Sequence, residues 1–385
     1  MRVKLSRRAR WAVPGAVVAV TAVTVAALQI PAAQAAPDLP ARTPAQLLAS
    51  LSSDAKVPPL TGTVVETASL GLPQLPGTSD PTSLASMLTG SHTVKVYYQD
   101  ATHFRLAVPQ PESETDVIAD GSKLWLWQST SDSVTEYLPS AGQVPQAEKQ
   151  LPAAAALTPQ QAANQVLQAV GQTTLVSVQA NVMVAGEPAY QLVLAPKSSS
   201  SLVGRVVIAI DGKYGVPLRV QLYAKGASSP AFQVGFTALQ FVTPSPANFD
   251  FTPPSGASVK VVKLARDSGK PAKSAGAEAS GYGQYGKSWL TVAEFPQRDL
   301  TQGFGAGAAG GKQPDAYSAN GNGVGVSSQE LLNALLGSAK PVSGSWGSGT
   351  LVSTSLVSLL ITNGEVYIGA VEPSVLYAAV GHTAS

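Results

Sequence analysis

The chain has 385 residues, enough for one large or two ordinary domains, and it is 44% hydrophobic but only 12% charged, as a globular protein is. It contains no cysteine, which excludes disulfide bonds, thiolate metal sites, a cysteine nucleophile and a lipidated N-terminal cysteine. With only three histidines and a formal net charge of +2, the composition favours neither a metal centre nor a nucleic-acid partner.

The first 35 residues have the pattern of an export signal. Basic residues at the start precede an apolar stretch from Ala12 to Ile30, and Ala33-Gln34-Ala35 matches a small-x-small cleavage site. The apolar stretch is near the lower length limit for spanning a bilayer, so retention by an uncleaved N-terminal anchor is the alternative. We therefore expect an exported protein, located in the cell envelope or secreted.

One short helix and a series of strands are predicted in the first part of the mature chain. Thr43, Pro44 and Gln46 form a capping box that opens the helix. Alternating apolar residues and turn signals then predict strands at 61–69, 92–99, 103–108, 114–119, 123–128 and 134–138. The intervening segment 70–90 carries three prolines and six large apolar residues, so we expect it to fold back over an apolar surface.

The stretch from Leu202 to Val259 organises the rest of the main domain. It follows a second capping box at Thr158–Gln161 and predicted strands at 175–184 and 189–195. Three apolar runs within it indicate long antiparallel strands, and in the second run Leu218, Val220 and Leu222 alternate with polar residues. The residues thus predict about ten or eleven antiparallel strands and two main helices, with one apolar and one polar face to the sheet.

The C-terminal part has a different composition. Residues 264–285 are rich in Lys, Ser, Ala and Gly, which is typical of a flexible linker, and residues 303–325 are rich in glycine. A strand is predicted at 288–295, a short helix after the capping box Ser327–Glu330, and a hairpin of 350–362 with 365–371 across Asn363-Gly364. This tail forms a small αβ unit or adds strands to the edge of the main sheet.

Three motifs suggest catalysis or nucleotide binding, and each has a simpler explanation. Gly281 to Ser288 fits the phosphate-binding pattern G-x-x-x-x-G-K-S, but a linker precedes it and a strand pattern follows, whereas the motif requires a strand before and a helix after. No G-x-S-x-G elbow is present, and His92 and His103 lie in strands among polar residues. Glu112, Glu114 and Asp116 could act as paired carboxylates, but we favour a solvated acidic edge.

Two stretches resemble the LolA-like family, which includes periplasmic lipoprotein carriers and the RseB/MucB regulators of envelope stress. Asp120-Gly121 followed by Leu124 to Trp127 resembles the family's DG-x-x-LW-x-aromatic hairpin. Residues 249–256, Phe-Asp-Phe-Thr-Pro-Pro-Ser-Gly, resemble its F-x-F-x-PP-x-G exit from the last long strand. The closest pattern is that of secreted actinobacterial LolA-like proteins.

The resemblance implies an α+β fold, a curved antiparallel half-barrel whose concave apolar face holds acyl chains under helices. The implied domains are a signal peptide at 1–35, a LolA-like half-barrel at 36–263, a flexible linker at 264–286 and a small C-terminal extension at 287–385. The carriers' Arg-Pro dipeptide is replaced by Gln99-Asp100-Ala101, so their lid latch is not expected here.

The predicted ligand-binding residues are the in-phase apolar residues of the long strands and one tryptophan. They are Val94, Val96, Phe104, Leu106, Trp125, Leu192, Leu194, Leu218, Val220, Leu222, Phe232, Val234 and Phe236. Core packing beneath a helix is the alternative for all of them. The predicted function is a non-catalytic lipid or lipoprotein carrier without cofactor or metal. The alternative is an RseB/MucB-like regulator that binds the extracytoplasmic part of an anti-sigma factor, an envelope membrane protein.

Overall fold

A computed structural model gives the structure of the protein. It describes residues 37–52, 57–69, 89–121, 123–138, 158–168, 171–263, 283–302, 337 and 339–383. The predicted export signal, most of the linker and the helix predicted after Ser327 lie outside these residues. Within them, no helix has the length and apolar character needed to cross a membrane.

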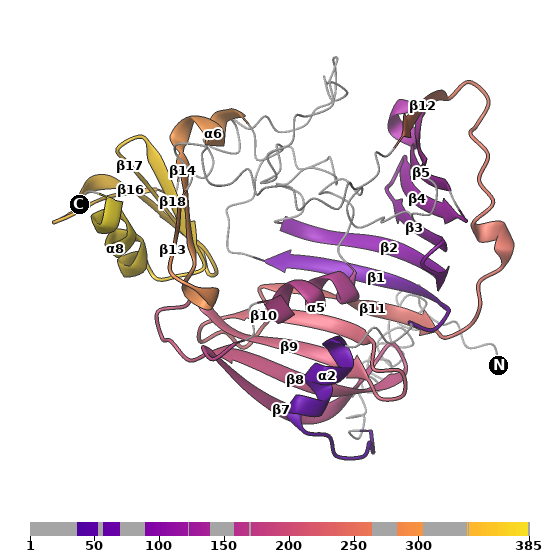
Figure 1. Ribbon diagram of the computed structural model, residues 1–385, viewed down its shortest axis with the longest axis horizontal. Helices are drawn as coiled ribbons and strands as arrows, with labels where there is room; N and C mark the ends of the chain where they lie inside the picture. The colour runs from indigo at the N-terminus through magenta and orange to yellow at the C-terminus, as the bar shows by residue number, and fades with distance from the viewer. Residues whose placement is uncertain are drawn as a thin grey trace, which may run out of the picture. The chain divides into compact units, whose positions relative to one another are not determined.

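The larger of two sheets has twelve strands and is open, with an edge at each end (Figure 1). Its strands are β1 (Leu60–Ser69), β2 (Thr89–Asp100), β3 (His103–Pro109), β4 (Glu114–Asp120), β5 (Lys123–Gln128), β6 (Ser133–Leu138), β7 (Thr174–Val184), β8 (Glu187–Pro196), β9 (Val203–Asp211), β10 (Pro217–Ala224), β11 (Phe232–Gln240) and β12 (Ser258–Lys263). They lie in the order β12-β6-β5-β4-β3-β2-β1-β11-β10-β9-β8-β7. The predicted α+β fold with a large curved antiparallel sheet is confirmed.

The twelfth strand, β12, is additional to the ten or eleven antiparallel strands that the sequence predicts. β12 pairs in parallel with β6, whereas the other neighbouring strands of this sheet are antiparallel. Its six residues alternate only partly and follow Pro253-Pro254, so the local pattern resembles an irregular exit from β11. The pairing with β6 depends on how the preceding segment crosses the sheet, which sequence periodicity does not report.

Two of the three predicted capping boxes lie among the described residues, and both open helices. In α2 (Pro44–Ser52), the backbone N–H of Gln46 donates to Thr43 Oγ1 at 3.2 Å, and that of Thr43 donates to Gln46 Oε1 at 2.8 Å. Thr158 and Gln161 make the same exchange at α5 (Pro159–Gln168), at 3.2 and 2.9 Å. Each helix therefore begins where its sequence predicts, because the side chains satisfy N–H groups that have no partner within the helix.

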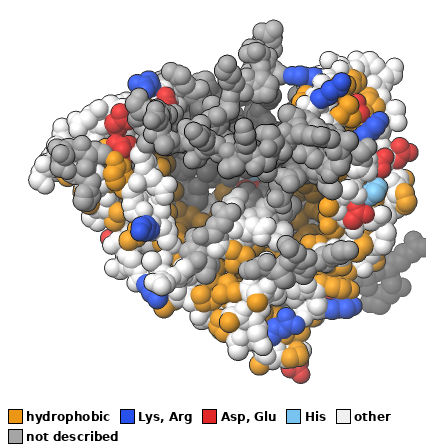
Figure 2. Space-filling model, in the orientation of Figure 1, with side chains coloured by type: hydrophobic (Ala, Val, Ile, Leu, Met, Phe, Trp, Pro, Cys, Tyr) orange, Lys and Arg blue, Asp and Glu red, His pale blue; other side chains and the backbone are white. Residues whose placement is uncertain are grey.

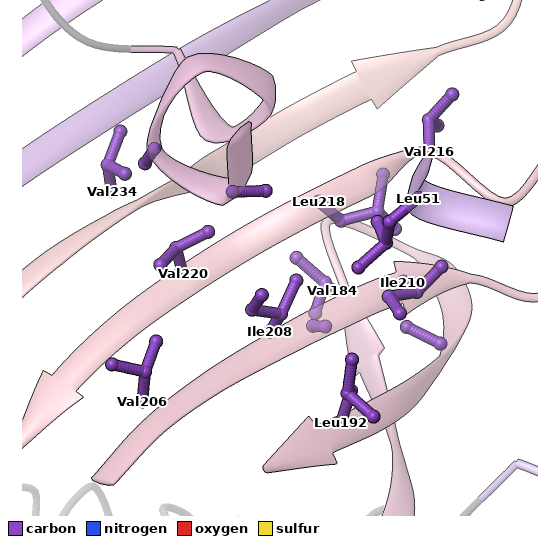
Figure 3. Packing of buried hydrophobic residues seen from close by; sticks show 14 of the residues in the cluster. Leu51, Val184, Leu192, Val206, Ile208, Ile210, Val216, Leu218, Val220 and Val234 are labelled. Carbon is purple, nitrogen blue, oxygen red and sulfur yellow. The ribbon is translucent and has the colours of Figure 1, made fainter. Parts of the chain in front are cut away.

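The main core lies between these helices and one face of β7 to β11, called here the inner face. Leu47 and Leu51 of α2 and Ala162 and Ala163 of α5 belong to the same buried cluster as Ile208 on β9. Figure 3 shows Leu51 pointing toward the side chains of the sheet beneath it. The amphipathic helices thus cover the apolar face that the strand alternation predicted.

The smaller sheet has six strands in the order β13-β14-β18-β17-β16-β15. These are β13 (Gly283–Tyr285), β14 (Val292–Pro296), β15 (Lys340–Gly344), β16 (Gly347–Ser353), β17 (Ser358–Thr362) and β18 (Glu365–Gly369), accompanied by α6 (Gln297–Gln302) and α8 (Pro373–Thr383). Leu360, Tyr367 and Leu376 form the centre of its core, where α8 packs on β17 and β18. The described tail therefore builds a sheet of its own.

Of two predictions for the tail, one is confirmed and the other is wrong. The hairpin across Asn363-Gly364 is confirmed, with φ values of 54° and 80° that suit a type I′ turn. The long strand predicted over 350–362 is wrong, because it is two strands, β16 and β17. They are separated by a turn in which Thr354 Oγ1 accepts a hydrogen bond from the Val357 N–H at 2.9 Å. Ser-Thr turns of this kind interrupt apolar runs without glycine or proline.

Candidate ligand-binding face

The inner face of the large sheet carries twelve of the thirteen predicted ligand-binding residues. Register pairs place Val96 opposite Leu106, and Leu106 opposite Val117, so the row continues from strand to strand. On the other side of β1, Val220 lies opposite Val234 and Leu222 opposite Phe232. Because directly paired residues point to the same face, the structure joins the two rows into one apolar surface.

Helices cover one half of this surface. The predicted residues Leu192, Leu194, Leu218, Val220 and Val234 are at most 2% exposed and lie in the cluster that contains the residues of α2 and α5. Figure 3 shows several of them packed together. A cavity of about 50 Å³ between α2, α5 and the β9–β10 turn is too small for an alkyl chain. The sequence does not tell whether protein or lipid covers the apolar face. In this half, side chains of the protein itself cover it.

The other half of the inner face has a core that includes no residue of a described helix. Phe104, Val117, Ala119, Leu124 and Leu126 form it, with Tyr98, Leu106 and Tyr137 packed against it. Phe104 is 8% exposed, and Leu106 is only partly buried. This region is called here the β2–β6 surface. Its apolar side chains come from five neighbouring strands.

The remaining predicted residues of this face are Val94 and Val96 on β2, Leu222 on β10, and Phe232 and Phe236 on β11. Val94 and Val96 are buried in the main cluster, and the other three are partly buried against it. Phe236 is opposite Val64 on β1, and its ring also lies over Gly62, where a Cβ atom would come within 2.8 Å of the ring carbons. Gly62 therefore lets the Phe236 ring lie flat against β1, which continues the apolar surface across the middle of the sheet.

Trp125 is the exception among the predicted ligand-binding residues. It lies on the opposite, outer face, where its ring centroid is 5.6 Å from that of Phe251 and where Ile118 and Val134 are also buried. Trp127 lies 6.4 Å from the same phenylalanine. The two stretches that resemble the LolA-like family thus pack on each other, because Phe251 belongs to the exit motif and the tryptophans belong to the hairpin.

Glu66 is a residue of the inner face that the sequence analysis missed. It is 3% exposed on β1 and lies in register with Val234 on one side and His92 on the other. The available signal was that Glu66 is in phase with the apolar Val64. The same pattern in an edge strand would leave the glutamate in solvent, so the sequence alone does not show that it is buried. Its carboxyl group places one polar function within an otherwise apolar surface.

The predicted solvated acidic edge is wrong, because β4 is an interior strand and Asp116 is only 1% exposed. Arg105 on β3 pairs with Asp116 and, at 3.0 Å, with Glu114 on the outer face. Burial and the neighbouring Glu114 raise the pKa of Asp116 to about 7, against the opposing charge of Arg105. Glu114 and Asp116 thus belong to an ion-pair cluster with Arg105. Predicting this cluster from the sequence would require knowing that Arg105 lies on the neighbouring strand.

The glycine-rich stretch before Ser288 is followed by a single 3-10 turn, Ser288–Leu290, and then by β14. A strand pattern was predicted at this position, and no helix begins there to face a phosphate. In the residues that the structure covers, no group of three or more His, Asp or Glu side chains is arranged to hold a metal ion.

No family model and no curated protein matches this sequence. The chain is similar to several solved structures. For a chain of the Pseudomonas aeruginosa MucA/MucB complex, identity is 13% and the TM-score 0.39, covering 88% of this chain and 96% of that one. An uncharacterized conserved protein from Thermus thermophilus has 12% identity and a TM-score of 0.32, and the match covers 57% of this chain and 99% of that one. A LolA superfamily protein from Nitrosomonas europaea has 10% identity and a TM-score of 0.21, and the match covers 55% of this chain and 99% of that one.

The MucB chain and the LolA superfamily protein belong to the family that the two motifs resemble.

Proposed function

We propose that this chain is an exported, non-catalytic protein that holds the acyl chains of a lipid or lipoprotein on the inner face of the twelve-stranded sheet. The observation that carries the proposal is the unequal cover of that face. Helices α2 and α5 fill the half made by β7 to β11, whereas no described helix contributes to the core of the β2–β6 surface. The binding site is therefore assigned to the β2–β6 surface and the adjoining Phe236.

The chemistry of this surface suits an alkyl chain. Transfer of each methylene from water to an apolar environment is favourable by about 0.8 kcal/mol, so a shallow apolar surface gives useful affinity without polar recognition. The side chains that the structure places there are aliphatic or aromatic, with Tyr98 and Tyr137 as the polar-tipped members.

Native mass spectrometry of protein purified from its own host tests the proposal directly. We expect extractable lipid in the wild-type protein and its loss in Leu106→Asp and Phe236→Asp. Leu175→Asp is the matched control, because Leu175 is a leucine of the same sheet that is 55% exposed. Lipid-free wild-type protein, or equal lipid in all variants that remain folded, would contradict the assignment.

An RseB/MucB-like role is the second candidate, and the attachment of the small sheet favours it. Leu202 and Ser200, just before β9, exchange backbone hydrogen bonds of 2.9 and 2.8 Å with Ala370 and Glu372. Lys225 adds an ion pair to Glu372 at 2.7 Å. A tail held by such bonds is suited to present a surface to a membrane-bound anti-sigma factor.

Affinity purification from membranes, with the full chain and with a chain that ends before residue 287, distinguishes the two candidates. A membrane protein retained only by the full chain supports the regulator. An unchanged set of partners, together with bound lipid in both chains, supports the carrier.

A further inference from the structure

The outer face of the large sheet contains a partly buried arginine that forms no ion pair with any described residue. Arg219 lies on β10, and burial lowers the pKa of its guanidinium group. Its Nε atom is buried and no acceptor lies within hydrogen-bond distance, and among the described residues no carboxylate forms an ion pair with Arg219. Burying part of a cation without an anion is unfavourable, and the five N–H donors of a guanidinium group normally find acceptors.

Arg105 provides the comparison within the same sheet. It also lies on the outer face, and there Asp116 and Glu114 supply two carboxylates. No carboxylate of the strands around Arg219 forms an ion pair with it in the described part of the chain. The acidic residues of β1, β9, β10 and β11 are Glu66, on the inner face, and the buried Asp211, whose Oδ1 accepts hydrogen bonds from the N–H groups of Lys213 and Tyr214 at the β9–β10 turn.

A glycine on the neighbouring strand makes room for the Arg219 side chain. Gly235 on β11 is the register partner of Arg219, and a Cβ atom at that position would lie 2.8 Å from Arg219 Cγ and 3.0 Å from its Cβ. These are the inner atoms of the side chain, which cannot move aside as freely as its end. The arginine stem therefore lies across the glycine, which limits the directions in which the guanidinium group points.

Gln221 and Tyr223 follow Arg219 along β10 on the same face. Gln221 donates to Gln233 at 2.7 Å and so occupies the Oε1 acceptor of Gln233. The guanidinium carbon of Arg205 on β9 lies 3.8 Å from the ring centre of Tyr223, two positions beyond Gln221 on the same face. Two guanidinium groups thus flank Gln221 and Tyr223, and neither is paired with a carboxylate in the described chain.

We propose that Arg219, with Arg205 beside Tyr223, binds the oxyanion of a phosphate-bearing ligand on the outer face of β9 to β11. A guanidinium group donates two parallel hydrogen bonds to such an oxyanion, and a site that is already partly desolvated strengthens them. A phosphate has more acceptor oxygens than a carboxylate, so it can also accept from the amide of Gln233. The site is independent of the proposed carrier function, because it lies on the opposite face of the sheet.

The arginine Nε–H signals of protein labelled with ¹⁵N-arginine test the site during titration with inorganic phosphate. We expect a saturable shift of the signal that disappears in Arg219→Gln, and a loss of affinity of about 10-fold or more in that variant. Arg219→Lys keeps the charge but not the paired donors, and we expect a comparable loss. Arg42→Gln is the matched control, since Arg42 is an exposed arginine over Tyr190 and its removal should change the affinity less than twofold.

Gly235→Ala separates geometry from charge. It leaves every cation in place but displaces the stem of Arg219, so affinity should fall while the net charge is unchanged. Circular dichroism establishes that each variant is folded. A wild-type Arg219 signal that moves no more than that of Arg42, or full phosphate affinity in Arg219→Gln, would overturn the proposal.

Sedimentation with lipid vesicles identifies the source of the phosphate. Binding to phosphatidylglycerol vesicles but not to phosphatidylcholine vesicles, lost in Arg219→Gln, indicates an anionic lipid headgroup. Saturable binding of inorganic phosphate without any vesicle binding indicates a soluble phosphate compound. Both results support the oxyanion site, and vesicle binding that is equal in Arg219→Gln and wild type speaks against it.

Discussion

The two halves of the twelve-stranded sheet have the same alternation of apolar residues, but their apolar faces are covered differently. Over β7 to β11, the inner face is closed by α2 and α5, and Leu218 is fully buried in the resulting core. Over β3 to β5, a similar row of apolar side chains forms a separate core that includes no residue of a described helix, and the partly buried Leu106 packs against both cores. The difference shows that a strand pattern specifies an apolar face, while the chain elsewhere decides what covers it.

The largest expected effect is on the helix-covered half. Leu218→Ala should lower the free energy of unfolding by about 2–5 kcal/mol, because it leaves a cavity under packed helices. Leu106→Ala, the same change on the β2–β6 surface, should cost clearly less. Urea unfolding followed by circular dichroism measures both, and equal losses would contradict the division of the inner face into a packed and a binding half.

The ion-pair cluster of the β2–β6 half should make stability depend on pH. The pKa of Asp116 is raised from 3.8 to about 7, so the folded chain holds a proton that the unfolded chain releases. The free energy of unfolding should therefore fall as the pH rises from about 4 to 7.

Thermal unfolding across this pH range checks the effect. Asp116→Asn should flatten the profile, whereas Glu112→Gln, at an exposed position of the same stretch, should not. A wild-type profile that rises with pH over the same interval would contradict the assignment.

A smaller effect is expected at the start of α5. Thr158→Ala removes the acceptor for the Gln161 N–H and should cost about 1 kcal/mol. Because α5 packs on β10 and β11, hydrogen exchange should increase first in these strands and less in β3 to β5. Equal increases in both regions would indicate that the two halves of the sheet unfold as one unit.

Much of the fold could be predicted from local signals. The capping boxes at Thr43 and Thr158, the hairpin at Asn363-Gly364 and most strand positions follow from hydrogen-bonding capacity and side-chain alternation. The site was predicted only in part. Twelve of the predicted residues share one face, but Trp125 lies on the other, since a resemblance to a family motif does not tell whether a conspicuous tryptophan packs inward or outward.

By itself, the sequence determined which segments form strands and helices, and that one face of the large sheet avoids water, because these properties depend on neighbouring residues. The tertiary structure alone decided that α2 packs on β7 and α5 on β10 and β11, that Asp116 meets Arg105, and that Arg219 forms no ion pair with a described carboxylate. Each of these depends on strand order and register, which bring together residues far apart in the chain.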